Sequence, residues 1–278
     1  MKQNQGPRRY RIGEYASYMG VTPDFLKHYE KKHIISADVQ DSGYRYYRFR
    51  ESCRILECMR LRNYGFTVRD MAEAVNCMDG DQAWQMLEEK AAAMEKQVEL
   101  ETAILEEHRR IRDWMQRIRG KGEDWVVQRM EPFYFLPHSH HNDFLKDPRI
   151  YDILNRWVSW MPVVKSTLQI QWDGSGEEEM NSAWGLLAGE AQVLCHGIPI
   201  NEAVQRIPAC KALVYSFAGR EFDGGTEADR DRRHPVYQWA ARLGLRPAGT
   251  VYKVMLMYAR MEQAPRLQYG FYILPLEE

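Results

Sequence analysis

The sequence predicts an α+β protein of several domains: an N-terminal winged helix-turn-helix, a long pairing helix, and a C-terminal duplicated α+β domain. Three observations lead to this prediction. Two short helical segments and a hairpin lie near the N-terminus, residues 81–119 contain neither proline nor glycine, and residues 125–278 alternate between strand-like and helix-like segments. The expected domain boundaries are 1–78, 79–120 and 121–278.

Composition excludes several classes of protein. Hydrophobic residues make up 45% of the chain, as in proteins that form a core, and no apolar stretch is long enough for a membrane span. The first eleven residues are polar and basic, unlike a signal peptide, so a cytoplasmic protein is expected. The cysteines are scattered and form no C-x-x-C pair, which argues against a disulfide framework or a structural zinc site: Cys53, Cys58, Cys77, Cys195 and Cys210. No cofactor is expected.

The charge is unevenly distributed along the chain. The total is −1, but residues 1–75 carry 14 Lys and Arg against 9 Asp and Glu, a net +5. The remaining residues therefore carry a net −6. A basic N-terminal part on an acidic remainder is typical of a DNA-contacting module attached to another domain, although ordinary surface variation also produces such differences.

The first helical pair has helix-turn-helix spacing. Residues 10–18, YRIGEYASY, predict a short helix that ends before a tight turn at Gly20. Thr22 is a favourable N-cap and Pro23 fits the first helical position, so a second helix is expected from Asp24 to Lys31. In a helix-turn-helix, this second helix enters the major groove of DNA.

The following segments predict a wing and two further helices. Residues 35–49 contain the turn signal Asp41-Ser42-Gly43 and then an aromatic run suited to a strand, which together predict a hairpin. Helical spacing returns over 51–63 and stops near Gly65. Thr67 and Asp70 form a capping-box pattern that opens another helix to about Val75.

Residues 81–119 predict one helix of about 58 Å at 1.5 Å per residue. Apolar residues follow steps of three and four, interrupted by Glu101 and Arg112. The members of this seam are Trp84, Leu87, Ala91, Met94, Val98, Leu105, His108 and Met115. A heptad seam indicates pairing with a second chain, because a solvated single helix would leave these side chains exposed. Gly120-Lys121-Gly122 is expected to end the helix and mark a domain boundary.

The C-terminal part predicts a strand, a helix and two strands, and then the same order again. The strand candidates are 125–136, 166–172, 183–188, 210–217, 249–258 and 267–274, and the helical candidates are 148–161 and 228–243. Such a duplicated α+β unit favours a cleft between its halves. Six of the eight tryptophans fall in this part of the chain.

Three stretches resemble the DNA-binding domain of the MerR family of transcriptional regulators. They are YRIGEYASYMGVTPDFLKHYEKKHII, SGYRYYRF and MRLRNYGFTVRDMAEAV, and they occur in the family's order. The long helix resembles that family's antiparallel dimerisation helix, and the C-terminal part resembles the GyrI-like effector module of its BmrR-like, multidrug-binding branch. The resemblance implies a homodimer that distorts promoter DNA in response to a small organic effector and affects RNA polymerase only indirectly. An activator is expected, and repression, alone or beside activation, stays open.

The resemblance also implies which residues contact DNA. Arg45 matches the family's wing arginine, Tyr29 a phosphate-contacting tyrosine of the recognition helix, and Arg62 a basic backbone contact. Arg45 is long, always charged and flanked by aromatics, as suits a phosphate contact. The expected DNA-binding residues are Thr22, Lys27, His28, Tyr29, Tyr44, Arg45, Tyr46 and Arg62.

Two positions of the recognition helix depart from the family and one is open. Lys27 and His28 stand where arginine and tyrosine are usual, and they lack the bidentate geometry of arginine. Asp24 either accepts a hydrogen bond from cytosine N4 or only favours the positive end of the helix dipole.

Aromatic content favours an apolar, planar effector in the C-terminal part. Along 249–258, alternation places Lys253 and Met255 on one face. The resemblance directs that face into the pocket, where a glutamate is usual, so a neutral or anionic ligand is expected. The expected ligand-binding residues are Lys253, Met255, Tyr269, Phe271, Trp172 and Trp184, although core packing explains each aromatic equally well.

Three alternatives remain at the level of sequence. Cys77, or the cluster of His138, His140 and His141, would serve a metal- or thiol-responsive regulator. A GyrI-like hydrolase fused to a DNA-binding domain is a second alternative, but we find no nucleophile elbow, no H-E-x-x-H and no Gly-rich phosphate loop, so no enzyme and no catalytic residue is predicted. Constitutive DNA binding without a ligand is the third.

Overall fold

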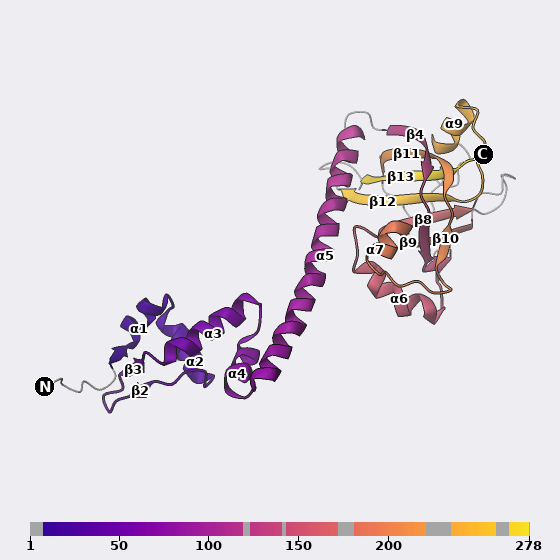
Figure 1. Ribbon diagram of the computed structural model, residues 1–278. Helices are drawn as coiled ribbons and strands as arrows, with labels where there is room; N and C mark the ends of the chain where they lie inside the picture. The colour runs from indigo at the N-terminus through magenta and orange to yellow at the C-terminus, as the bar shows by residue number, and fades with distance from the viewer. Residues whose placement is uncertain are drawn as a thin grey trace. The chain divides into compact units, whose positions relative to one another are not determined.

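The computed structural model describes residues 8–118, 123–140, 143–171, 181–220, 235–259 and 267–277. The chain divides into two compact units, Met1–Val98 and Glu99–Glu278. The α+β class is confirmed: the chain has an N-terminal helix-turn-helix, a long helix and a sheet-rich C-terminal domain (Figure 1). Within the described residues, no helix is long and apolar enough to cross a membrane.

The first unit contains four short helices and a small sheet. Its helices are α1 (Ile12–Met19), α2 (Pro23–Lys31), α3 (Glu51–Asn63) and α4 (Val68–Asn76). Its strands are β1 (Arg9–Arg11), β2 (Asp38–Val39) and β3 (Arg45–Arg48), in the order β1-β3-β2. The predicted hairpin is therefore confirmed, but the first helix begins two residues later than expected, because residues 9–11 pair with β3 instead.

Local capping signals set the limits of these helices. The Thr22 hydroxyl accepts a hydrogen bond from the Phe25 amide at 3.1 Å, and Thr67 and Asp70 form the complete capping box. Gly20, with φ +65°, ends α1 in a left-handed conformation that favours glycine. The core around Leu26, Ile34, Tyr47 and Ile55 then joins the helices to the wing.

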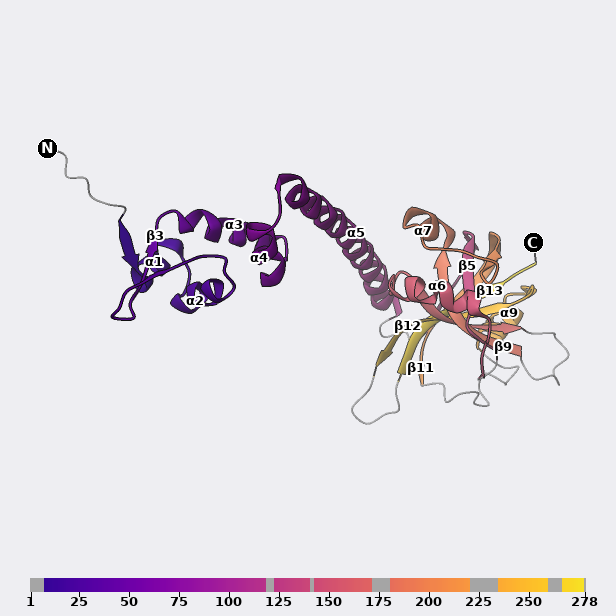
Figure 2. The same ribbon diagram turned by 90° about the horizontal axis from the view of Figure 1, so that it is seen from below.

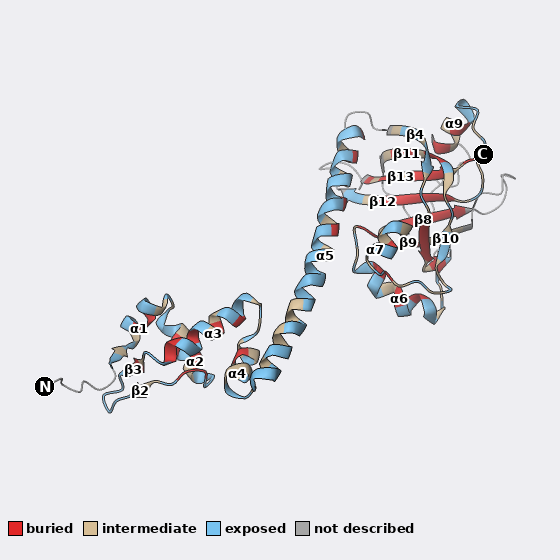
Figure 3. Ribbon diagram, viewed as in Figure 1, coloured by how far each residue is buried: buried red, intermediate tan, exposed pale blue. Residues whose placement is uncertain are grey.

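A continuous helix, α5 (Gly80–Ile118), begins in the first unit, ends in the second and confirms the predicted long helix. Its buried residues are few, as the mostly exposed ribbon in Figure 3 shows. They are Ala103, Glu107, Trp114 and Ile118. The expected stop at Gly120-Lys121-Gly122 lies outside the described residues.

Among the described residues, the C-terminal domain is built on one antiparallel sheet of eight strands, which Figure 2 shows from below. The strand order is β10-β5-β9-β8-β12-β13-β11-β4. The strands are β4 (Glu123–Met130), β5 (Phe133–Pro137), β8 (Lys165–Gln171), β9 (Asn181–Gly189), β10 (Gln205–Ile207), β11 (Cys210–Arg220), β12 (Val251–Ala259) and β13 (Leu267–Pro275). The helices are α6 (Pro148–Val158), α7 (Glu190–Cys195) and α9 (Pro235–Arg242), and β6 (Ser139–His140) pairs with β7 (Asp143–Phe144).

The order of the six central strands supports the duplication. Strands β5, β9 and β8 of the first half mirror β11, β13 and β12 of the second, and the halves meet where β8 pairs with β12. Helix α6 follows β5 as α9 follows β11. The two predicted units therefore share one continuous sheet.

Two predicted elements of this domain need correction. The single strand expected over 125–136 is two strands that lie far apart in the sheet, because Pro132 cannot donate a ladder hydrogen bond and the chain changes direction there. Helix α6 ends at Val158 rather than residue 161. Of the helix expected over 228–243, residues 228–234 lie outside the described residues and α9 covers the rest.

The sheet has two distinct faces. We call one the α9 face: Val236 and Ala240 of α9 pack there against Leu213 and Leu274. Alternation along the same strands places α6 on this side as well, against Leu136 and Leu186. The opposite side is the α5 face, which carries Val254, Ile273 and Phe135.

Gly270 is required by a close approach of two strands. A Cβ atom at this position would lie 2.1 Å from the Val254 carbonyl oxygen and 3.2 Å from Cζ of Phe217. We expect Gly270→Ala to lower the free energy of unfolding by about 1–3 kcal/mol, because β12 and β13 must move apart. Gly13→Ala is the matched control: its Cβ meets nothing within 4 Å in a helix, so stability should rise. Thermal unfolding of both variants measures the difference, and an unchanged melting temperature for Gly270→Ala would contradict the packing.

Candidate nucleic-acid interface and effector-binding face

Helix α2 presents a polar surface outside the core. Thr22, Lys27 and His28 are exposed, whereas Leu26 is fully buried. The Lys27 ammonium lies 3.0 Å from the Asp24 carboxylate, and both side chains are open to solvent. Such an exposed pair contributes little to stability, so Lys27 remains available for an anionic partner.

Tyr29, the expected phosphate contact of the recognition helix, is a core residue. It is 3% exposed, and its ring stacks on Phe25 with 4.0 Å between centroids. Burial raises the pKa of the Tyr29 hydroxyl, and the nearby charge of Arg62 opposes that rise. The sequence did not predict the burial of Tyr29, because an aromatic residue fits either the buried or the exposed side of an amphipathic helix.

The wing residues form a small polar network with α2. Arg45 Nε donates to the Glu30 carboxylate at 3.2 Å, and the Tyr47 hydroxyl donates to the same oxygen at 3.2 Å. The Arg45 side chain is still 42% exposed. Burial of the Tyr47 ring beside Glu30 raises the pKa of that hydroxyl, so it stays protonated and donates. Glu30 therefore positions Arg45 on the wing without burying its charge.

Two aromatic residues of the wing contact an arginine that the sequence analysis did not single out. The Arg11 guanidinium lies 5.5 Å from the ring centroid of Tyr44, which is largely exposed. A hydrogen bond with Tyr46 raises the pKa of Arg11. Because β1 pairs with β3, Arg11 is brought opposite Tyr46 in the sheet. This pairing is a tertiary feature without a local sequence signal.

In the C-terminal domain, Lys253 is buried in the α9 face. The residue is 5% exposed, and its ammonium nitrogen lies 5.7 Å from the ring centroid of Phe217 and 5.8 Å from that of Tyr272. Such distances allow cation–π attraction. Desolvation of an ammonium group is costly, and the two rings offset part of that cost.

The register of the strands places Lys253 in a row of side chains that runs across the sheet. Lys253 is opposite Leu168 on one side and Tyr272 on the other. The row continues on each side with further aromatics. Its members from β9 to β4 are Trp184, Leu168, Lys253, Tyr272, Tyr215 and Trp125. Trp125 in turn contacts Trp239 of α9, with 5.2 Å between centroids.

The expected ligand-binding residues do not all share this row. Phe271 is opposite Val254 and Tyr269 is opposite Met257. Phe271 therefore lies on the α5 face, whereas Lys253 lies on the α9 face, which corrects the expectation of one shared pocket wall. The reason is alternation: Lys253 pairs with Tyr272, and the neighbouring Phe271 must point the other way.

Met255, Trp184 and Trp172 have separate outcomes. Met255 is buried two residues from Lys253, where it pairs with Gly270 next to a strand irregularity. Trp184 is half-buried in the row, and its amide donates to the Ser139 hydroxyl at 3.0 Å. Trp172 lies outside the described residues.

Comparison with known proteins decides the family. A model of the MerR HTH regulatory proteins matches residues 10–76, which span α1 to α4. The HTH-type transcriptional regulator ZntR of Escherichia coli K12 is 30% identical over 98 residues, 35% of this chain and 70% of that protein. The chain belongs to the MerR family. The nodulation protein NolA of Bradyrhizobium sp. (strain NC92) is 38% identical over 74 residues, 26% of this chain and 30% of NolA.

Solved structures give weaker likenesses. The EcmrR–DNA complex studied by cryo-electron microscopy in EcmrR-RPo has a TM-score of 0.39 at 16% identity, and covers 97% of this chain and 100% of that chain. The EcmrR C-terminal domain has a TM-score of 0.35 at 13% identity over 56% of this chain and 98% of that chain. Scores at this level do not establish a common fold.

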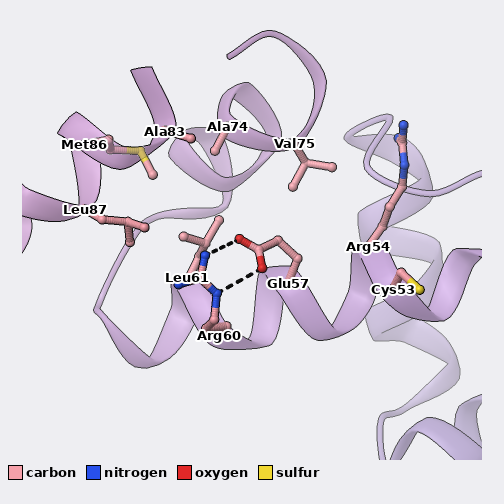
Figure 4. A pocket seen from close by; sticks show the side chains of 10 residues that line it. All are labelled: Cys53, Arg54, Glu57, Arg60, Leu61, Ala74, Val75, Ala83, Met86 and Leu87. Atoms are coloured by element: carbon pink, nitrogen blue, oxygen red, sulfur yellow. Dashed lines mark hydrogen bonds and ion pairs between the residues drawn. The ribbon is translucent and has the colours of Figure 1, made fainter. Parts of the chain in front are cut away.

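The MerR-type domain meets the first turns of α5 around a cavity of about 300 Å³ (Figure 4). The cavity is lined by α3, α4 and α5: Cys53, Arg54, Glu57, Arg60, Leu61, Ala74, Val75, Ala83, Met86 and Leu87. Arg60 and Glu57 form an ion pair at 2.6 Å along its side. Nearby, the Lys90 ammonium lies 5.4 Å from the Phe66 ring centroid. The start of α5 is thus packed on the DNA-binding domain.

The sequence offered Cys77 and the cluster of His138, His140 and His141 as possible metal ligands. Among the described residues, no group of three His, Cys, Asp or Glu side chains is placed to hold a metal ion. Cys77 is exposed at the end of α4, and His141 lies outside the described residues. His138 is half-buried, and burial lowers its pKa. Nothing in the described geometry favours Cys77 as a sensing thiol.

Proposed function

We propose that this MerR-family regulator binds promoter DNA as a homodimer and distorts it when the C-terminal domain binds a small, mostly aromatic organic molecule. The observation that carries the proposal is helix α5. Its first turns pack on the DNA-binding domain, and its last turns pack on the sheet that contains Lys253. RNA polymerase is affected indirectly, through the altered promoter. The C-terminal domain has the duplicated α+β architecture expected from its resemblance to GyrI-like effector modules.

The proposed DNA contacts come from α2, the wing and α3. Thr22, Lys27 and His28 lie on the exposed part of α2, and Tyr44, Arg45 and Tyr46 belong to the wing or its edge. Arg62 is exposed on α3. Tyr29 supports this surface from within, because its buried ring fixes α2 against the core. Phosphate contacts of this kind position the protein on DNA without reading its sequence.

Arg45→Ala tests the wing contact. We expect weaker binding to specific and non-specific duplexes alike, and a salt dependence flatter by about one unit of slope. Arg206→Ala is the matched control, because Arg206 is also half-exposed and paired with a glutamate, Glu190, but lies in the C-terminal domain. Fluorescence anisotropy over a salt series measures both variants. Unchanged affinity and slope for Arg45→Ala would refute the proposed contact.

The apolar seam of α5 supports the homodimer. Trp84, Met94, Val98 and Leu105 are each more than 40% exposed in the single chain. By helical geometry, Val98 and Leu105 lie roughly 180° from Glu107 and Trp114, which face the sheet. The seam is therefore left open by the sheet of the same chain, and a second α5 helix would cover it.

Val98→Glu and Leu105→Glu should weaken the dimer. A carboxylate buried in a helix–helix seam lacks a partner, so we expect the dissociation constant to rise at least about tenfold. Ala93→Glu is the control, since Ala93 is exposed on the side of α5 away from the seam. Sedimentation of the wild type should give twice the 32.8 kDa chain mass. A wild type that is monomeric at micromolar concentration would exclude the proposed dimer.

The proposed effector site lies on the α9 face around Lys253. Rings of Phe217 and Tyr272 flank its ammonium, and the aromatic row extends the surface on both sides. Planar aromatic molecules suit such rings, and an ammonium favours a neutral or anionic molecule over a cation. Trp184 and Met255 border the same face.

Three probes with the same ring test the charge preference: naphthalene-1-sulfonate, 1-naphthalenemethanol and 1-naphthylmethylammonium. We expect the sulfonate and the alcohol to bind more tightly than the cation in tryptophan-quenching titrations of the full chain. Lys253→Met should weaken the binding of the sulfonate about tenfold, because a charge-assisted hydrogen bond is lost. The same variant should leave the affinity for the alcohol nearly unchanged. Lys253→Glu should reverse the preference.

Two outcomes would contradict this proposal. Tight binding of 1-naphthylmethylammonium by the wild type would show that Lys253 does not determine the charge preference. Chemical conversion of the probes, detected by mass spectrometry after incubation, would indicate an enzyme, because a sensor releases its ligand unchanged.

A further inference from the structure

The last turns of α5 are held on the sheet by two buried polar contacts. Glu107 lies 3.0 Å from the Lys165 ammonium, and the Trp114 indole nitrogen donates to the Ser216 hydroxyl at 2.9 Å. Glu107 is 4% exposed and Trp114 is 7% exposed. Glu107 and Trp114 are two helical turns apart, about 10 Å along the axis, and so lie on the same side of α5.

The two contacts lie on either side of the strands that carry the proposed effector site. Lys165 belongs to β8 and Ser216 to β11, and the pair β12–β13 lies between those strands in the sheet. Strands are about 4.8 Å apart, so β8 and β11 are roughly 14 Å apart across the sheet. Between the two contacts, α5 therefore crosses the back of the strands that bear Lys253 and Tyr272.

Alternation along β11 connects the two faces directly. Ser216 points to α5, whereas its neighbours Tyr215 and Phe217 point to the α9 face. Phe217 is the ring beside the Lys253 ammonium, and Tyr215 continues the row from Tyr272. On β8, Leu168 is the partner of Lys253 on the α9 face, three residues from Lys165. A shift of either strand caused by a ligand on one face must move a contact of α5 on the other.

We infer that the Glu107–Lys165 and Trp114–Ser216 contacts transmit effector binding from the sheet to α5. The inference rests on the proposed function, because it assigns the route by which that effector would act. A ligand that enters the Lys253 row changes the spacing of β8 and β11 across β12–β13. Helix α5 responds as a rigid element because it is bound to both strands.

The chemistry of the contacts makes them suited to transmission. Glu107 is buried and also accepts from Arg110 at 3.1 Å, so separation from Lys165 would leave a buried charge with fewer partners. The Trp114 indole can only donate, and its partner Ser216 is itself nearly buried. Apolar packing alone would allow α5 to slide over the sheet, whereas these directional contacts require it to follow the strands.

The other end of α5 has its own contacts with the DNA-binding domain. Met86 and Leu87 line the cavity against α3 and α4, and the Lys90 ammonium is 3.4 Å from the Gly65 carbonyl. Gly65 lies in the turn between α3 and α4. The start of the same helix, Gly80–Ile118, therefore contacts the turn between α3 and α4.

Hydrogen exchange of the full chain tests the inference, with naphthalene-1-sulfonate as the probe. In the wild type, the probe should change the exchange rates of residues 99–118 by at least about threefold. Trp114→Phe removes the donor while keeping an apolar ring, and combined with Lys165→Met it removes both contacts. We expect this double variant to bind the probe within about twofold of the wild type and to lose the exchange response.

Gln85→Met is the matched control, because it removes an N–H donor to Glu89 from an exposed position of the same helix, outside the seam. Its exchange response should match that of the wild type. A response that persists in the double variant would overturn the inference while leaving the effector site intact. Failure of the wild type to bind the probe would instead contradict the proposed aromatic effector site.

A second measurement needs no ligand. Trp114→Phe removes a contact of α5 with one face of β11, and Phe217→Leu changes a side chain on the other face of that strand. The effect of the double variant on the unfolding equilibrium constant should differ from the product of the two single effects by more than about twofold. The control pair Trp114→Phe with Thr67→Ala, which lies in the other unit, should be multiplicative. Multiplicative behaviour in both pairs would overturn the transmission through β11.

Discussion

The fold depends on the two opposite sides of α5. Glu107 and Trp114 make polar contacts with the C-terminal sheet, and Val98 and Leu105 on the other side remain exposed. Residues seven apart lie on the same side of an α-helix. Val98 and Leu105 therefore form one stripe along α5, and Glu107 and Trp114 form a second stripe on the opposite side. One stripe of the helix thus contacts the sheet of its own chain, and the other is the stripe proposed to pair with a second chain.

The two faces of the C-terminal sheet likewise carry different kinds of side chain. The α9 face holds Lys253 among aromatic rings, and the α5 face holds the partners of the long helix. Adjacent residues of one strand, such as Ser216 and Phe217, therefore belong to different surfaces. This alternation places the proposed binding site and the surface that contacts α5 on opposite sides of the same strands. A displacement of one of these strands would therefore affect both surfaces.

The DNA-binding domain is assembled from local signals supported by a few tertiary contacts. Caps at Thr22 and Thr67 define the helices, and Glu30 joins the recognition helix to the wing by accepting from Arg45 and Tyr47. The family match over residues 10–76 covers these elements. Two basic side chains of this domain remain accessible in their ion pairs: Lys27 is 54% exposed and Arg45 is 42% exposed.

The sequence by itself determined the class, the order of the main helices and the duplication, whereas the start of α1 and the end of α6 differed from the prediction. Helix caps, the heptad spacing of α5 and alternating strands are local patterns, and each was visible in residues such as Thr67 and Asp70. Tertiary structure decided where those elements meet. It placed Tyr29 in the core, separated Phe271 from Lys253, divided residues 125–136 between two strands, and brought Arg11 to the wing. These outcomes depend on strand register and on contacts between residues distant in sequence, such as Trp114 and Ser216, which no local pattern encodes.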